Sequence, residues 1–163
     1  MIRACKLIGF SEKFQTMLEE AIVLYDKLLK IELIKYELCS VPYFSHTMNE
    51  PPQVWEDCSV NLTINFIAFR PKWYKPWQKR VCAYTSYVDG KSGNIHINVT
   101  KFLRNPQKLT GTIAHEIMHL VKESGTKPAR GYGHGNNSPK GKQKSVPYTY
   151  GRVFYEHAKR ISY

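Results

Sequence analysis

The first long amphipathic pattern in the chain begins after Ser11, whose side chain suits the N-cap of a helix. From there to Leu29, apolar residues recur at the three- and four-residue spacing of one helix face. That face consists of Phe14, Met17, Leu18, Ala21, Ile22, Tyr25, Leu28 and Leu29. We expect a helix that packs behind a β-sheet with this face in the core, although the same stripe also suits contact with a partner helix.

The middle of the chain alternates between apolar and polar residues, which is the period of a half-buried strand. The clearest strand is predicted over residues 59–69. Its apolar face holds Val60, Leu62, Ile64, Phe66 and Ala68. Two further strands are predicted at 81–88 and 94–99, joined by a turn at 89–93 that is rich in residues tolerating positive φ.

Between these patterns, residues 31–38 fit either a continuing helix or a first strand. Pro42, Pro51 and Pro52 predict a loop after them, because proline removes a backbone donor and restricts the residue before it. Near the end of the chain we expect an exposed loop at 138–145 and a final helix from Arg152 to about Arg160.

A second long helix is predicted to begin at Asn105, a good N-cap residue, with Pro106 in its first turn and Gly125 as a natural stop. With about 100° between successive residues, its apolar arc holds Leu109, Ile113, Ile117, Leu120 and Val121. The opposite arc holds Thr112, His115, Glu116 and His119. We therefore expect one side of this helix to sit on the core and the other to face a cleft.

Inside this helix, residues 115–119 read His-Glu-Ile-Met-His. Because His115 and His119 lie four residues apart on one helix face, their imidazole nitrogens can reach one zinc ion. The carboxylate of Glu116 stands beside them, where it can take a proton from the water that such a metal activates. The alternative is a pair of ordinary helix histidines with Glu116 in solvent.

A catalytic zinc site needs a third protein ligand and keeps one position open. No aspartate follows residue 89, and the later glutamates are Glu123, one turn further along the same helix, and Glu156. Of the later histidines, His134 is preferred over His157 because its glycine-rich surroundings at 130–137 allow the backbone to turn the side chain back to the metal. The alternative for His134 is a solvated loop histidine.

Taken together, these motifs resemble the SprT-like metalloprotease family, in which His-Glu-x-x-His is followed by a Gly-His-Gly turn. Here the third histidine of the pattern comes fifteen residues after His119, and the resemblance extends over roughly residues 81–135. It implies that His115, His119 and His134 bind Zn²⁺. It also implies that Glu116 is the general base for hydrolysis of peptide bonds in a protein or peptide substrate.

The expected fold is one α+β domain of the zincin type over residues 1–163, a length that suffices for a single core. The predicted order is a backing helix, a mostly antiparallel twisted sheet, the helix with residues 115–119, a loop that returns His134, and a C-terminal helix. In zincins a free strand edge near this helix pairs with the substrate backbone. Either 81–88 or 94–99 fits that role.

Three tyrosines follow the histidine motif closely enough to be candidates for a catalytic role: Tyr132, Tyr148 and Tyr150. A tyrosine hydroxyl near zinc can donate a hydrogen bond to the oxyanion that develops on a peptide substrate. Since the chain has eleven tyrosines, a packing role is the alternative for each of them.

The chain is strongly basic, with 24 Lys and Arg against 13 Asp and Glu and a net charge of +11. Such a charge favours nucleic acid, acidic substrates or anionic surfaces as partners. The segment 70–80 combines five cations with three large aromatic residues, a composition that suits single-stranded nucleic acid. We favour instead a hairpin loop whose tryptophans fold onto the body, with weak nonspecific nucleic-acid binding at most.

The four cysteines form no Cys-x-x-Cys pair, so neither a zinc knuckle nor a redox motif is indicated. No signal peptide and no membrane-spanning stretch is apparent, and a cytoplasmic location is expected. The function favoured by these observations is zinc-dependent peptide hydrolysis. Two alternatives remain open: a nucleic-acid-associated module in which nucleic acid gates proteolysis, and a non-catalytic zincin scaffold used for binding.

Overall fold

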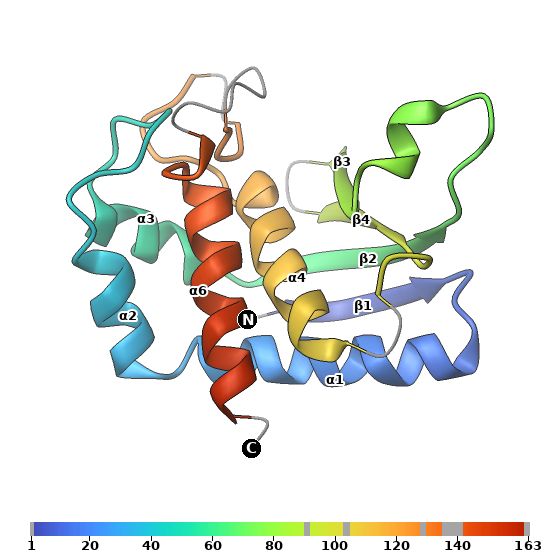
Figure 1. The fold of residues 1–163 in the computed structure, drawn as a ribbon. Helices are drawn as coiled ribbons and strands as arrows, with labels where there is room; N and C mark the ends of the chain where they lie inside the picture. Colours follow the sequence, from blue (N-terminus) through green and yellow to red (C-terminus); the bar gives the residue numbers. More distant parts are fainter. Residues whose placement is uncertain (1, 90–91, 103–104, 128–129, 135–141, 162–163) are drawn as a thin grey trace.

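The computed structural model describes residues 2–89, 92–102, 105–127, 130–134 and 142–161 (Figure 1). Its helices and strands follow in chain order: β1 (Ile2–Ile8), α1 (Glu12–Leu28), α2 (Glu32–Cys39), α3 (Pro51–Cys58), β2 (Leu62–Phe69), the 3₁₀ helix η1 (Pro76–Lys79), β3 (Ala83–Asp89), β4 (Ser92–Asn98), α4 (Pro106–Leu120) and α6 (Val146–Ile161). The α+β class is therefore confirmed. Parts of the predicted segments 89–93, 130–137 and 138–145 lie outside the described residues.

The four strands form one mixed sheet in the order β1-β2-β4-β3. β2 pairs in parallel with both β1 and β4, and only β3 and β4 are antiparallel. The expectation of a mostly antiparallel sheet is therefore wrong. One reason is that β1 was not predicted as a strand. The other is the path of the chain: after β2 it crosses to the edge of the sheet and forms β3 there, and β4 then returns between β2 and β3.

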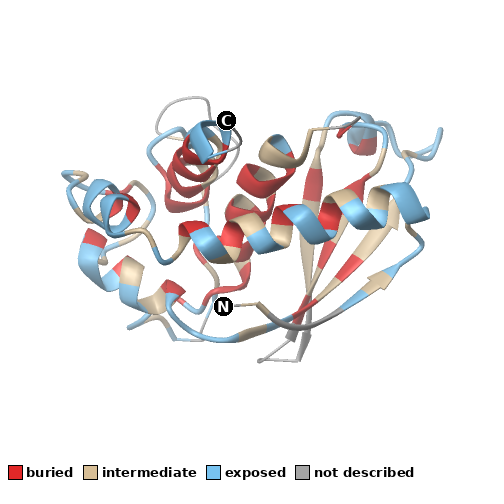
Figure 2. Cartoon of the chain, turned by 90° about the horizontal axis from the view of Figure 1, so that it is seen from below, coloured by how far each residue is buried: buried red, intermediate tan, exposed pale blue. Residues whose placement is uncertain are grey.

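Helices cover one face of this sheet, and the core lies between them and the strands. Ile64, Phe66, Ile95 and Ile97 of the two central strands are completely buried. Along α1, buried and exposed residues alternate (Figure 2), and Leu18, Ala21, Tyr25 and Leu28 point into the core. The predicted backing helix is thus confirmed, with its apolar stripe packed inside the protein rather than left for a partner.

The C-terminal helix α6 lies beside α4 (Figure 1), and the two helices approach each other at two glycines. A Cβ atom added to Gly111 would lie 2.7 Å from the carbonyl oxygen of Gly151, and one added to Gly151 would lie 3.1 Å from Cβ of His115. The two helix backbones therefore approach each other at the level of His115. This approach places the first turns of α6 over the middle of α4.

Several element boundaries differ from the predicted ones for local reasons. The ambiguous segment 31–38 is helical as α2, and Pro51 and Pro52 open α3 instead of a loop because proline fits the first turn of a helix. α6 likewise begins before Arg152, with Pro147 in its first turn. At the start of α4 the predicted cap is confirmed, since the Asn105 side chain accepts a hydrogen bond of 2.8 Å from the Lys108 backbone.

The end of α4 comes earlier than Gly125. The helix stops at Leu120, and Val121 adopts an extended conformation with its side chain fully buried. Lys122 then pairs with Gly131 in an antiparallel bridge. Burial of Val121 and this bridge end the helix, while Gly125, with φ of +81°, forms a turn in the loop that follows.

The segment between β2 and β3 is a crossing connection and not a hairpin loop. The Asn98 amide donates hydrogen bonds to the carbonyl oxygens of Gln78 and Val81, at 3.2 and 3.1 Å, and so holds the segment to β4. Trp77 contacts Tyr84 of β3 at a ring distance of 5.5 Å, but Trp73 is 86% exposed. The expectation that both tryptophans fold onto the body is therefore wrong for Trp73.

Among the described residues, the helices are either too short or too polar to cross a lipid bilayer.

Candidate metal centre

Three histidines from two parts of the chain meet at the C-terminal half of α4. His115 and His119 come from successive turns of that helix, and His134 comes from the segment that returns to it. One ligand nitrogen from each lies within 4.8 Å of the others. The structure thus brings together the three residues that were predicted as metal ligands, and each is half-buried.

The chemistry of this donor set fits zinc. Zn–N bonds of about 2.0–2.1 Å place the nitrogens of a tetrahedral site roughly 3.4 Å apart. The ligand nitrogens already lie within 4.8 Å of one another, so small side-chain rotations would bring them to that spacing. Three neutral imidazoles also leave the fourth position free, as a catalytic site requires.

The imidazoles of His115 and His119 are held in the neutral form that a metal ligand needs. Burial, together with the neighbouring His119 and His134, lowers the pKa of His115 to about 3. Burial also lowers the pKa of His119. The Nδ1 atom of His119 lies 2.7 Å from the carbonyl oxygen of Tyr132, which can only accept, so Nδ1 carries the proton. Nε2 is then the nitrogen available to a metal.

Glu116 lies next to these ligands and is only 6% exposed, so the alternative of a solvated Glu116 is wrong. Burial raises the pKa of its carboxyl group to about 8. A carboxyl group with a pKa near neutrality is suited to exchange a proton with a reacting water, since the best catalytic pKa lies close to the working pH.

This pKa predicts a stability effect in the metal-free protein. Between its usual value of 4.5 and about 8, the folded state keeps a proton that the unfolded chain releases, so stability falls as pH rises. From pH 6.5 to 8.5 the loss should be roughly 2 kcal/mol, at about 1.4 kcal/mol per pKa unit. The Glu116→Gln variant lacks this group and should lose less. Urea unfolding of both proteins at the two pH values measures the difference, and parallel pH dependences would contradict a buried, proton-binding Glu116.

The three candidate tyrosines have different surroundings. The ring of Tyr148 stands edge-on to His115 at 4.6 Å and lies 5.3 Å from His134. The hydroxyl of Tyr132 instead donates to Asp57 at 2.6 Å, and Tyr150 is buried between Phe44 and Phe154. Of these three, Tyr148 is therefore the one beside the histidines, carried there by the close approach of α6 and α4.

Sequence reasoning missed Lys142, whose Nζ lies 4.8 Å from the ring centre of Tyr148. Its charge also contributes to the lowered pKa of His115, so a cation lies at the edge of the histidine cluster. No local pattern distinguished Lys142 from the other lysines of 138–145. Only the packing of the start of α6 on α4 identifies it.

The remaining candidate ligands lie elsewhere. His157 hydrogen-bonds Glu37 of α2 at 2.8 Å, and His96 stacks on Tyr84 at 4.4 Å. Glu123 is buried and bonds the Thr47 hydroxyl, with Arg130 at 3.7 Å. These partners explain the buried polar groups without a metal.

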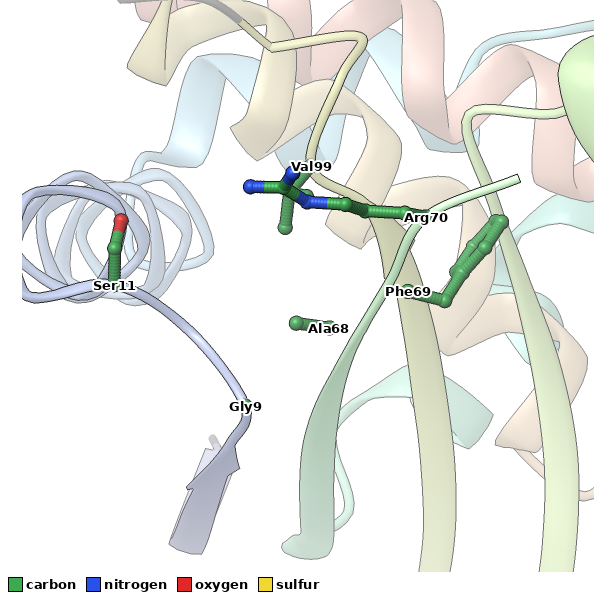
Figure 3. Close-up of a pocket in the computed structure, with 6 residues that line it drawn as sticks. All are labelled: Gly9, Ser11, Ala68, Phe69, Arg70 and Val99. Atoms are coloured by element: carbon green, nitrogen blue, oxygen red, sulfur yellow. The ribbon is translucent and has the colours of Figure 1, made fainter. Parts of the chain in front are cut away.

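A separate pocket of about 310 Å³ lies at the carboxyl ends of β1 and β2 and includes none of the three histidines. It is lined by Gly9, Ser11, Ala68, Phe69, Arg70 and Val99. In Figure 3 the side chain of Arg70 extends along this opening toward Val99. Arg70 is exposed to solvent, whereas Glu116 beside the histidines is buried.

Comparison of the chain with protein-family models, with curated proteins and with solved structures finds no match.

Proposed function

We propose that this protein is a zinc-dependent metallopeptidase of the zincin type, related to the SprT-like family. The observation that carries the proposal is the cluster of His115, His119 and His134 beside the buried Glu116. Zinc bound there would polarise the scissile carbonyl and make water a nucleophile near neutral pH. The test is cleavage of peptide libraries by the zinc-loaded protein and by its Glu116→Gln variant, read by mass spectrometry.

In this proposal the chain's own residues move the protons. Glu116 takes a proton from the attacking water and later passes it to the leaving amine. Its burial keeps competing solvent away from the carboxyl group. Tyr148, packed against His115 and His134, is the residue that would donate a hydrogen bond to the developing oxyanion of the substrate.

The sheet suggests where an extended substrate would lie. β4 is enclosed between β2 and β3, whereas β3 is an edge strand next to the helix that carries the histidines. A peptide can add to such an edge through its main-chain hydrogen bonds. The sequence offered two strands, 81–88 and 94–99, as the one that pairs with substrate. Of these, β3 is the one with a free edge.

We expect a peptidomimetic with a zinc-binding group to slow hydrogen exchange of amides in Ala83–Asp89. The amides that face away from β4 should show the effect, because those facing β4 are already bonded within the sheet. The opposite edge strand, β1, is the internal control, since it borders β2 and not the histidine cluster. Protection of β1 in place of β3 would contradict this substrate position.

A second candidate function, nucleic-acid-gated proteolysis, is favoured by the segment 70–80. Trp73, Tyr74 and Trp77 are 86%, 54% and 48% exposed, and five cations lie among them. Exposed aromatic rings between cations can stack the bases of a single strand. The hydrogen bonds from Asn98 keep this segment ordered, which lowers the entropy cost of binding.

If this segment binds a single strand, Trp73→Ala or Trp77→Ala should weaken binding by roughly 1–3 kcal/mol per stacked base. Fluorescence anisotropy with a labelled oligonucleotide at low and high salt measures this loss. Tyr36→Ala is the matched control, because the exposure of Tyr36, at 71%, lies between those of Trp73 and Trp77, but Tyr36 lies on α2. Equal affinities of all three variants and the parent would reject stacking, whereas peptide hydrolysis that requires added DNA or RNA would make gating the primary function.

A further inference from the structure

The segment that carries His134 is anchored to α4 through Tyr132. The Tyr132 backbone N–H donates to the carbonyl oxygen of Met118 at 3.0 Å, and its carbonyl oxygen accepts from Nδ1 of His119 at 2.7 Å. The same residue stands two positions before His134. The placement of Tyr132 therefore affects two of the three histidines. It sets the orientation of the His119 ring and the position of the backbone from which the His134 side chain extends.

The backbone around Tyr132 is intrinsically pliable and depends on such contacts to hold one conformation. Gly131 and Gly133 flank this residue, and glycine loses more conformational freedom on ordering than any other residue. Besides its backbone bonds, the segment is held by the Tyr132 side chain, which is 1% exposed. Its hydroxyl donates to Oδ2 of Asp57 at 2.6 Å and accepts from the Asn49 amide at 3.1 Å.

Asp57 connects both ends of this loop to α3. Besides Tyr132, its carboxylate accepts from the backbone N–H of Ser124 at 2.9 Å and from the Ser124 hydroxyl at 2.5 Å. Ser124 lies just after the end of α4, and Tyr132 lies just before His134. Figure 1 shows this segment, in orange after α4, on the side of α3. One carboxylate thus closes the loop from the last turn of α4 to the third histidine.

We propose that Asp57 and Tyr132 are positioning residues for the metal site, acting through His119 and His134 without touching the metal. The inference rests on the proposed function, because it requires that the three histidines bind zinc. It assigns a role to α3, which carries no predicted ligand. It also assigns Tyr132 a different role from hydrogen-bonding a substrate oxyanion, because its hydroxyl is committed to Asp57 and Asn49.

The test compares zinc affinities of Tyr132→Phe, Asp57→Asn and the double variant, by competition with a chromophoric chelator at 25 °C. Loss of a partner behind a metal ligand typically weakens binding by roughly 10–100-fold, and we expect that range for each single variant. The double variant should bind zinc no more weakly than the single variant with the lower zinc affinity, because both changes break the same contact between Asp57 and Tyr132. Controls are Tyr25→Phe, a buried core tyrosine, and Asp26→Asn, whose carboxylate accepts from the Ile2 backbone.

A second readout separates positioning from a general loss of stability. The visible absorption of bound Co²⁺ reports ligand geometry, so it should change in both Asp57 and Tyr132 variants and stay unchanged in the two controls. Circular dichroism of the metal-free proteins shows whether each variant is folded, so that weak zinc binding by an unfolded variant is not attributed to a change in the metal site. If the parent binds zinc and these variants match the controls in affinity and Co²⁺ spectrum, the positioning role is wrong. If the parent binds no zinc, the proposed function itself fails.

Discussion

Replacing His134 with alanine should remove stoichiometric zinc binding, although the two histidines of α4 stay in place. Two imidazoles on one helix face bind zinc weakly, because a stable site needs a third protein ligand. The affinity should therefore fall by well over the roughly 100-fold that a change behind a ligand produces. Metal analysis after dialysis and chelator competition measure this loss. His115→Ala and His119→Ala should lose zinc to a similar degree.

His96→Ala provides the matched control for this experiment. His96 is also a half-buried histidine, but it stacks on Tyr84 and bonds Ser86 on the sheet. The control should retain about one zinc per chain. Full zinc occupancy in the His134→Ala protein would remove His134 from the ligand set, and with it most of the resemblance to the SprT-like family.

The Glu116→Gln variant should keep its zinc and lose peptide hydrolysis by roughly 10²–10⁴-fold, the contribution typical of general acid–base catalysis. Glutamine has nearly the same shape as glutamate but cannot take a proton from water. Since Glu116 is not one of the clustered ligands, zinc affinity should remain close to that of the parent. Rates are measured on a responsive library peptide by mass spectrometry, with zinc content determined on the same samples.

The two variants together distinguish the mechanism from its alternatives. Loss of activity with full zinc content assigns Glu116 to the reaction, whereas His134→Ala should lose both zinc and activity. Equal rates for Glu116→Gln and the parent would reject Glu116 as the general base. A protein that binds zinc but cleaves no peptide, with or without nucleic acid, would instead be the non-catalytic scaffold considered from the sequence.

Local sequence patterns were sufficient for the features that depend on a few neighbouring residues. The spacing of apolar residues identified α1 and α4, and Asn105 identified the cap of α4. The four-residue separation of His115 and His119 placed both on one face, because helix geometry alone determines it. The elimination of other ligands left His134 and His157, and the glycine-rich surroundings favoured His134, which the structure brings to the same cluster.

The sequence by itself therefore identified α1, α4, the central strand β2 and the three clustered histidines with Glu116, because side-chain periodicity and capping act over one or two turns. Only the tertiary structure decided the strand directions, the exposure of Trp73 and the surroundings of Tyr132 and Tyr148. Alternation shows which face of a strand is buried but carries no information on its neighbour's direction. Likewise, Tyr132 and Asp57 lie 75 residues apart, so their contact depends on how α3 packs against the loop after α4.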